Sequence, residues 1–162
     1  MDIRLGELAD AEAIAAIYNA EVLGGTATFD LVPRTVEEQR AWLLERSGAL
    51  AVLVAVVNEN EIAGYASLSK FRDRPAYSTT VESSVYVHAD HRRSGVASAL
   101  MTELLATAAA HGFHAIIARI ADSQEASLEL HRRLGFDLVG VEREIGRKFG
   151  RWLDVSVMQV II

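Results

Sequence analysis

The sequence predicts a mixed α/β fold, in which helices cover both faces of a twisted mixed sheet of about seven strands. Apolar segments of strand length alternate along the chain with segments of helical periodicity. The early strands follow one another through tight turns, which indicates antiparallel pairing, whereas helices separate the later strands, which indicates parallel pairing. With 162 residues and 51% apolar composition, we expect one domain over residues 1–162.

The first third of the chain predicts one short strand and two helices. Residues 3–5 read as the strand, and Asp10 is placed to cap the helix that follows. Thr35 and Glu38 have the spacing of a capping box, which predicts a second helix running through Leu44.

Three strands follow in close succession. Residues 50–57 form a dense apolar run, and the polar turn at 58–61 returns the chain as a partner strand over residues 62–70. Residues 80–88 alternate apolar and polar side chains, which predicts a further strand.

The second half predicts helices and strands in alternation. A helix follows the basic loop near residue 95 and ends at Gly112, and residues 115–120 form a fully apolar strand. Asp122 is placed to cap the next helix, which ends at Gly135.

Two final strands, at residues 136–141 and 153–161, complete the predicted sheet. The predicted order of elements is therefore β-α-α-β-β-β-α-β-α-β-β.

Composition excludes several classes of function. The formal net charge is -6 and the Lys and Arg residues are scattered, which argues against a nucleic-acid partner and against binding to an anionic membrane surface. The chain has no cysteine, which excludes disulfides, zinc-thiolate sites and a cysteine acyl-enzyme. The histidines lack metal-ligand spacing, so we expect no metal, and we expect a cytoplasmic location since no signal or membrane-spanning segment is visible.

The most informative segment is a strand that runs into a short basic loop and then a helix. A helix start offers unpaired N–H groups and a positive dipole end, and Gly95 lets the backbone approach an anion closely. Arg92 and Arg93 add positive charge, and the small Ala97 and Ser98 leave room in the first turn. These features suit a pyrophosphate site, although a basic loop with a glycine turn would give the same pattern.

The run Arg92-Arg93-Ser94-Gly95-Val96-Ala97 resembles the Arg/Gln-x-x-Gly-x-Gly/Ala motif of the GNAT superfamily of N-acetyltransferases. The resemblance implies that acetyl-CoA is the co-substrate. It also implies that the backbone amides of this segment, from Arg92 as far as Ser98, hold the pyrophosphate of acetyl-CoA. It also implies a splayed strand whose free backbone groups at Val85, Tyr86 and Val87 pair with the pantetheine arm.

Four further segments resemble the phosphinothricin acetyltransferase branch, which includes enzymes that acetylate methionine sulfone and methionine sulfoximine. They are residues 26–30, 80–87, 130–136 and 148–154. The match runs in order over nearly the whole chain. It implies transfer of an acetyl group to the amine of a small amino acid or its analogue, and a homodimeric enzyme.

Amine acylation by a thioester requires a base for the ammonium group and a donor for the tetrahedral oxyanion. The resemblance assigns the base to Glu82 and the donor to the backbone N–H of Val87. A carboxylate with a pKa of about 4.3 is a weak base until burial raises that pKa. The alternative for Glu82 is an ordinary exposed strand glutamate. Without cysteine, direct transfer in a ternary complex is the simplest mechanism.

Three residues of the last helix are further candidates for the cofactor side. His131 stands where many members of the superfamily carry a tyrosine general acid, and it could either donate a proton to the CoA thiolate or line the cofactor channel. Gln124 stands where the family usually has an asparagine that contacts pantetheine, so this contact is in question. Ser127, one helical turn later, matches a cofactor contact better.

For the acceptor, the resemblance points to an aromatic wall at Phe29 and a carboxylate site at Arg72 and Arg74. A solvated basic loop is the alternative for the arginines. Three further residues are expected at the rim of the site or across a dimer interface: Lys148, Phe149 and Trp152.

Two other functions are consistent with the same motifs. One is acetylation of a protein N-terminus, which would favour an open groove over arginines around a closed pocket. The other is a non-catalytic CoA-binding module, which the presence of both Glu82 and Gly95 disfavours.

Overall fold

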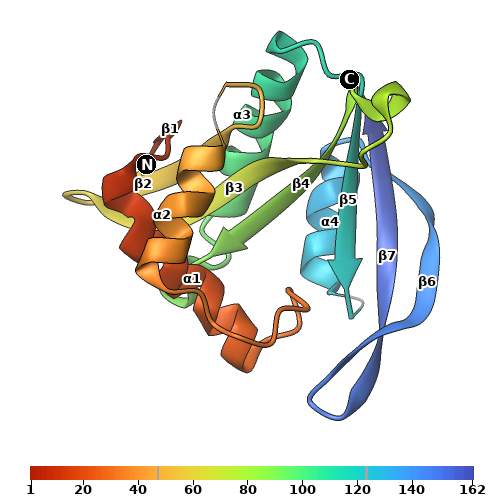
Figure 1. Cartoon of the computed structure of the whole chain (residues 1–162), viewed down its shortest axis with the longest axis horizontal. Helices are drawn as coiled ribbons and strands as arrows, with labels where there is room; N and C mark the ends of the chain where they lie inside the picture. Colours follow the sequence, from red (N-terminus) through yellow and green to blue (C-terminus); the bar gives the residue numbers. More distant parts are fainter. Residues whose placement is uncertain (47, 123) are drawn as a thin grey trace.

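The computed structural model describes residues 1–46, 48–122 and 124–162, which contain four α-helices and a seven-stranded sheet (Figure 1). The strands are β1 (Asp2–Leu5), β2 (Val52–Val57), β3 (Glu61–Lys70), β4 (Thr80–Val87), β5 (Ala115–Ala121), β6 (Asp137–Lys148) and β7 (Arg151–Ile161). The helices are α1 (Ala11–Gly24), α2 (Val36–Glu45), α3 (Val96–Ala110) and α4 (Glu125–Arg133). The short 3-10 turns are η1 (Leu8–Asp10), η2 (Pro75–Tyr77) and η3 (Ala89–His91). The expected α/β fold is confirmed.

The sheet order is β1-β2-β3-β4-β5-β7-β6. Strands β1 to β4 are antiparallel as expected, and β4 pairs with β5 in parallel. The expected parallel pairing of the later strands is wrong beyond β5. Strand β7 lies between β5 and β6 and is antiparallel to both, because the tight β6–β7 hairpin returns the chain into the position beside β5.

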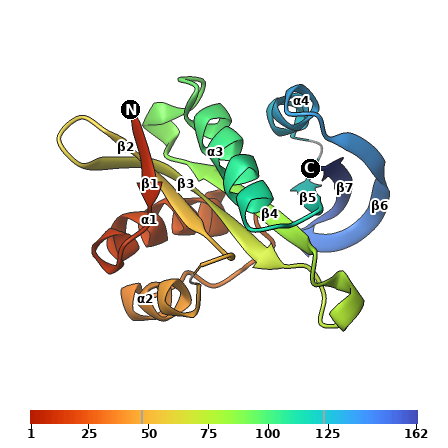
Figure 2. The ribbon, with the colours of Figure 1, turned by 90° about the horizontal axis from the view of Figure 1, so that it is seen from above.

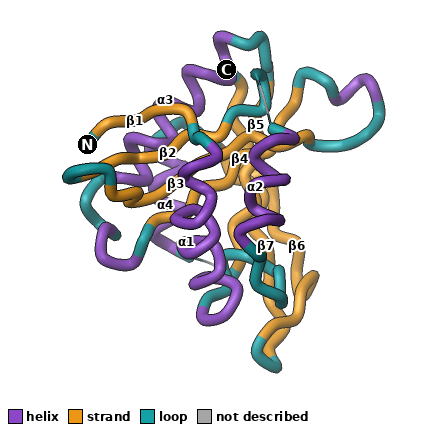
Figure 3. The backbone as a smooth tube through the Cα atoms, turned by 60° about the vertical axis from the view of Figure 1, so that its left-hand side comes forward, coloured by secondary structure: helices purple, strands orange, loops and turns teal. Residues whose placement is uncertain are grey.

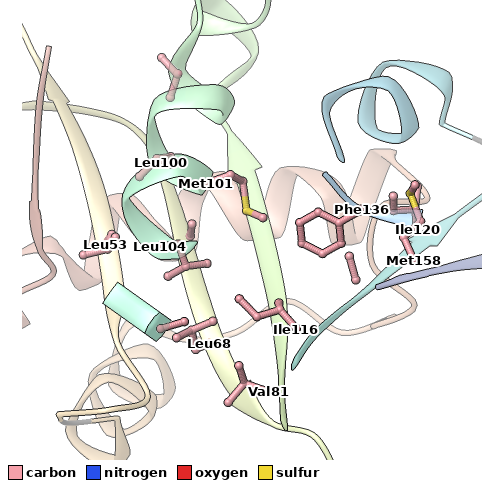
Figure 4. Close-up of a cluster of buried hydrophobic side chains, with 14 of the residues drawn as sticks. Leu53, Leu68, Val81, Leu100, Met101, Leu104, Ile116, Ile120, Phe136 and Met158 are labelled. Carbon is pink, nitrogen blue, oxygen red and sulfur yellow. The ribbon is translucent and has the colours of Figure 1, made fainter. Parts of the chain in front are cut away.

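Helices α1 and α2 cover one face of the sheet, and α3 and α4 cover the other (Figure 2). The larger core cluster lies under α3, where Leu100 and Leu104 pack over Leu68 of β3 and Ile116 of β5 (Figure 4). A second cluster lies between α1, α2 and the opposite face of β2 and β3. These two clusters hold the central strands rigidly, which fixes the geometry of the site described below.

Of the helix caps expected from the sequence, the one whose partners lie within three residues of each other is confirmed. The Thr35 hydroxyl accepts a hydrogen bond from the backbone N–H of Glu38, and the Glu38 carboxylate accepts one from the backbone N–H of Thr35, so the capping box is confirmed. Asp10 instead accepts hydrogen bonds from the Arg4 side chain and the Glu7 backbone, and it makes no side-chain cap bond to α1. The expectation that Asp10 caps α1 is wrong because the arginine and the η1 turn engage its carboxylate.

The cap expected at Asp122 is also wrong, because α4 begins at Glu125 with Gln124 as its N-cap. The Asp122 carboxylate instead accepts hydrogen bonds from Thr26 at 3.1 Å and Arg151 at 3.0 Å. It therefore ties the loop after α1 to β7.

Strand β6 is longer than the run of residues 136–141 that the sequence indicates. It continues to Lys148, with shifts of register between Leu138 and Gly140 and between Glu142 and Gly146. Such bulges break the period-two alternation by which a strand is recognised in a sequence.

The feature that creates the site is a divergence of β4 from β5 (Figure 1). Their ladder ends at Ser83 and Ala118, yet β4 stays paired with β3 as far as Val87 and β5 stays paired with β7 as far as Ala121. The end of β4 therefore has one edge without a neighbouring strand.

Candidate active site

A cavity of about 60 Å³ lies where β4 and β5 diverge. Its lining comes from the loop after α1, from both strands and from α4. These residues are Ala27, Ser83, Ser84, Val85, Tyr86, Ala118, Arg119, Ile120, Ala121, Gln124, Ser127 and His131. Successive strand residues point to opposite faces of a sheet, so a lining with consecutive residues of β4 and β5 means that the cavity passes through the sheet.

The free edge of β4 offers backbone groups to a ligand. The N–H of His88 donates to the carbonyl of Ala63 in β3 at 2.8 Å. Backbone groups alternate in direction along a strand, so those of Tyr86 also face β3, while those of Val85 and Val87 face the divergence. Val85 lines the cavity, and Val87 lies one step further along the same edge.

The backbone of Tyr86 is not available for the expected pairing with the pantetheine arm, because its N–H and C=O face β3. Its ring stacks on Tyr65 at 5.4 Å and meets the edge of Tyr18 at 5.2 Å. Burial raises the pKa of the Tyr86 hydroxyl well above its usual value, so this side chain stays neutral. Tyr86 supports the wall of the cavity through packing.

The loop before α3 has the form of an anion site. Arg93 has φ 60° and Gly95 has φ 86°, and the first intrahelical bond runs from the N of Ala99 to the O of Gly95 at 3.0 Å. The amides of residues 96–98 therefore have no partner within the helix, and α3 has no side-chain cap bond. A side chain at position 95 would be strained by this positive φ, which explains the glycine.

The side chains of this loop divide into engaged and free groups. Arg92 forms an ion pair with Glu21 of α1 at 2.5 Å, and the Ser94 hydroxyl donates to the carbonyl of His91. Val96 is buried in the core under α3, so it can offer only its backbone. The exposed Arg93 and the small side chains at 97 and 98 surround the free amides.

Glu82 is partly buried and lies on the α1/α2 face of the sheet, since it alternates in phase with Tyr86. Burial raises the pKa of its carboxyl above the ordinary value of 4.5, the neighbouring Arg119 opposes this shift, and Glu142 adds to it. Arg119 is engaged by both carboxylate oxygens of Glu142, one of them at 3.0 Å. The raised pKa makes Glu82 a stronger base than an exposed glutamate.

His131 is 3% exposed and faces the cavity from α4. Its Nδ1 lies 2.7 Å from the carbonyl of Ser127, and a carbonyl can only accept, so Nδ1 carries the proton. Burial lowers the pKa of the imidazole, which therefore stays neutral at pH 7 with a lone pair on Nε2. The proton-donor role considered for His131 would require the imidazolium form.

Three other polar residues of the lining are Gln124, Ser127 and Ser83. The side-chain amide of Gln124 donates to the Thr26 hydroxyl at 3.4 Å, and the backbone carbonyl of Ser127 accepts from His131. The hydroxyl of Ser83 is buried and has no hydrogen-bond partner among the residues that the structure describes. Sequence reasoning missed Ser83, although its alternation with Val81 in the strand would have placed it on the α3/α4 face.

Two of the expected acceptor residues lie in the segment that joins β3 to β4. Arg72 and Arg74 line a second hollow together with Phe71, Asp73 and Tyr77. Arg72 is near enough to Glu142 to lower the pKa of that carboxyl, so it shares the electrostatic surroundings of Glu82. No hydrogen bond or ion pair in the described structure links Arg74 to Glu82.

Phe29 is 38% exposed and lies over β6. A Cβ at Gly146 would approach its ring to 2.2 Å, so glycine is required there for the ring to pack. Phe29 lines neither hollow, but its neighbour Thr28 is fixed by a hydrogen bond of 2.8 Å to the Tyr18 hydroxyl. The loop therefore presents this aromatic ring beside the acceptor side in a defined position.

The three expected rim residues separate into two groups. Lys148 is 3% exposed, and its Nζ donates to the carbonyls of Glu21 at 3.1 Å and Thr28 at 2.9 Å. It is therefore a brace between the β6–β7 hairpin and the loop after α1. Phe149 and Trp152 are more than half exposed on that hairpin.

Replacing Lys148 with Met should destabilise this brace. The carbonyl of Glu21 keeps the hydrogen bond from the N–H of Gly25, whereas the carbonyl of Thr28 loses its bond from Lys148. A buried carbonyl left unpaired costs about 1–3 kcal/mol. We expect a lower melting temperature and a weaker apparent affinity for the acceptor amine, with the affinity for acetyl-CoA nearly unchanged. Calorimetry and initial-rate kinetics measure both effects. A variant with wild-type stability would contradict the assignment of Lys148 as a brace.

The described part of the chain shows neither a metal-binding cluster nor a membrane-spanning helix. Residues 1–46, 48–122 and 124–162 contain no cluster of His, Asp and Glu side chains that could hold a metal ion. Within the same ranges no helix is long and apolar enough to cross a membrane.

A strand divergence with a free backbone edge, followed by an anion-type loop at a helix start, suits a ligand that carries a diphosphate and an extended polar arm. Residues 3–157 match the family model described as "Acetyltransferase (GNAT) domain". The chain belongs to this family and is an acyltransferase.

Three similar proteins narrow the comparison. The L-methionine sulfoximine/L-methionine sulfone acetyltransferase of Pseudomonas aeruginosa is 40% identical over 98% of this chain and 92% of its own. A phosphinothricin acetyltransferase of Sinorhizobium meliloti, solved with acetyl-CoA, has a TM-score of 0.96 and 36% identity over 99% of this chain and 88% of its own. A ribosomal-protein-alanine N-acetyltransferase of Brucella melitensis has a TM-score of 0.96 and 37% identity over 100% of both chains.

Proposed function

We propose that this enzyme transfers the acetyl group of acetyl-CoA directly to the amine of a small amino acid or its analogue, of the methionine sulfone, methionine sulfoximine or phosphinothricin type. The observation that carries the proposal is the cavity at the β4–β5 divergence. Its lining on β4 begins at Ser83, directly after Glu82, and the same strand leads on to the loop of residues 92–95 before α3. The names of the Pseudomonas and Sinorhizobium relatives support this substrate class.

On the cofactor side, the amides of residues 96–98 and the side chain of Arg93 bind the diphosphate. The free amide edge at Val85 and Val87 holds the pantetheine arm and the thioester oxygen. Gln124, Ser127 and His131 line the channel. These backbone groups fit acetyl-CoA because no strand or helix pairs with them. No metal is needed for this chemistry.

On the acceptor side, Glu82 takes the proton from the ammonium group, directly or through a water molecule. The neutral amine then attacks the thioester carbon from the α1/α2 face, and an outward amide of β4 binds the oxygen that becomes negative. The outward amides are those of Val87 and of Val85, and Val85 lines the cavity itself. The chain has no cysteine, in keeping with transfer that does not pass through a thioester on the enzyme.

The acceptor carboxylate binds to Arg72, with Arg74 from the same loop, while Phe29 forms an apolar wall. Arginine suits this task because its planar fork matches a carboxylate. The hollow around both arginines supports the assignment.

The enzyme is a homodimer through its β6–β7 hairpin, whose far end projects from the rest of the chain (Figure 3). Large apolar side chains are exposed on this hairpin, and such patches mark interfaces. They are Leu138, Val139, Val141, Ile145, Phe149, Trp152 and Ile161.

We further propose that residues 1–162 form one domain, since all described strands join one sheet, and that the enzyme is cytoplasmic.

Charge introduced into this apolar surface should separate the dimer. We expect the wild type to sediment at twice the chain mass of 17.7 kDa and the combined Val139→Asp and Ile145→Asp variant at the single mass. Leu23→Asp, on an exposed position of α1, is the control and should remain dimeric. Sedimentation of the wild type at 17.7 kDa would refute the dimer.

Acetylation of a protein N-terminus is the second candidate, and the similarity to the Brucella enzyme favours it. A thiol-release assay with acetyl-CoA separates the two. Methionine sulfone, methionine sulfoximine and phosphinothricin should each release CoA far faster than peptides with a free N-terminus. Faster release with peptides would replace the proposed function with the second one.

A further inference from the structure

Ser83 occupies a special place in the divergence of β4 from β5. It is the last residue of β4 that is paired with β5, opposite Ala118, so it lies where the two strands begin to separate. Its side chain is 5% exposed and lines the cavity. Its hydroxyl has no hydrogen-bond partner among the described residues, an arrangement that costs free energy unless a ligand completes it.

The other buried or charged donors of the cavity lining are already engaged. Arg119 is held by the carboxylate of Glu142, and the amide of Gln124 donates to Thr26. The Nδ1–H of neutral His131 donates to the carbonyl of Ser127, and Nε2 can then only accept a hydrogen bond. A group that gains negative charge in this cavity would therefore find the Ser83 O–H as the buried unengaged side-chain donor.

We propose that the hydroxyl of Ser83, in place of the imidazole of His131, donates the hydrogen bond that stabilises the thiolate leaving group of CoA. This inference rests on the proposed function. In the step concerned, a C–N bond forms between the amine and the acetyl carbon while the C–S bond breaks, and sulfur departs with the bonding electron pair. The proton lost by the amine passes to Glu82. Ser83 keeps its own proton and only shares it with sulfur.

Two features make the assignment chemically reasonable. A hydrogen bond to an ionised acceptor is roughly twice as strong as one between neutral groups, so it acts more on the departing thiolate than on the neutral thioester. The bond is also available without deprotonating any residue, since a serine hydroxyl carries its proton throughout the pH range of catalysis.

The test compares the binding of CoA with that of desulfo-CoA, in which hydrogen replaces the thiol, by calorimetry at pH 9. At this pH the ionised fraction of a thiol is many times larger than at pH 7, so a donor that prefers the thiolate has its largest effect on binding. Wild-type enzyme should bind CoA about tenfold or more tightly than desulfo-CoA, as expected for a charge-assisted hydrogen bond. Ser83→Ala should reduce this preference to within about twofold and lower kcat by about tenfold or more.

The control variant is Ser67→Ala, which removes a buried serine from the adjacent strand β3 on the opposite face. It should keep the wild-type preference. The melting temperature of Ser83→Ala without ligand should equal or exceed that of the wild type, because only an unpaired hydroxyl is lost. If the variant does not fold, equal binding of the two ligands by the wild type would still exclude a donor for the thiolate in this cavity.

Equal binding of both ligands by the wild type would overturn the role of Ser83 while leaving acetyl transfer intact. An unchanged preference and kcat in Ser83→Ala would also overturn it. Failure of the wild type to bind either ligand would instead overturn the proposed function, and this inference with it.

Discussion

Glu82→Gln should reduce kcat by about 100-fold or more, because positioned general bases contribute roughly 10²–10⁴ to rate. Glutamine keeps the size and the partial burial of the side chain but cannot take a proton. The dissociation constant of acetyl-CoA should stay within about twofold of the wild type, since Glu82 lies on the α1/α2 face and the cofactor approaches along the β4 edge. Thiol release and calorimetry measure the two quantities.

Glu103→Gln, on the exposed surface of α3, is the matched control and should leave kcat unchanged. If Glu82→Gln turned over at the wild-type rate, Glu82 would be only a strand glutamate. Loss of acetyl-CoA binding in the same variant would indicate a structural role instead of a catalytic one.

The pH profile gives a second view of the same residue. Burial raises the pKa of Glu82, so the base is ionised only above a pH higher than its ordinary value of 4.5. The acid limb of kcat/KM should therefore bend above pH 4.5. Glu142→Gln removes a carboxylate that raises this pKa and releases Arg119, which lowers it, so the limb should move to lower pH. A limb that moves to higher pH would contradict this electrostatic account.

Arg72→Met should raise the KM of an amino acid acceptor by about 10- to 100-fold, the range expected when a hydrogen bond to a charged group is lost. Methionine preserves much of the length and the apolar stem, so packing against Phe71, whose ring lies 4.9 Å from the guanidinium, is partly retained. The KM of acetyl-CoA should not change. Initial rates with methionine sulfone measure this effect.

A substrate control sharpens the result for Arg72. The matching amine without a carboxylate should be acetylated equally by the wild type and by the variant. Arg40→Met, on the exposed surface of α2, should behave as the wild type with both acceptors. An equal loss for both acceptors would show that Arg72 acts on the structure of the loop and not on the carboxylate.

Features that depend on short stretches of backbone could be predicted from the sequence. The capping box at Thr35 and Glu38 needs only two side chains and nearby amides. The glycine at 95 marks a left-handed residue directly before a helix, and the structure has φ 86° there. Such signals depend only on neighbouring residues, so the tertiary arrangement of the chain does not change them.

Features that depend on distant parts of the chain could not be predicted. Asp10 and Asp122 have the residue type and spacing of caps, but arginines outside their own helices engage both carboxylates: Arg4 from β1 and Arg151 from β7. Lys148 reads as a surface residue, yet the backbone carbonyls of Glu21 in α1 and of Thr28 in the loop after α1 hold it in the interior. Strand β7 lies between β6, its hairpin partner, and β5. The apolar pattern of β7 identifies a strand but does not indicate that β5 is its second neighbour.

The candidate site shows the same division. The motif of residues 92–97 could be located from its spacing, whereas the end of the β4–β5 ladder at Ser83 depends on how two strands diverge. The direction of each backbone group then follows from alternation, which separates Val85 and Val87 from Tyr86. The neutral tautomer of His131 required the distance from its Nδ1 to a carbonyl one helical turn away.

A crystal structure of the enzyme with acetyl-CoA is the most direct test of the central claim, which is that the free edge of β4 binds the thioester arm. We expect the diphosphate on the amides of residues 96–98 and the thioester oxygen within hydrogen-bonding distance of the N–H of Val85 or Val87. Acetyl-CoA bound at any other surface, with the divergence of β4 and β5 left without ligand, would contradict the account.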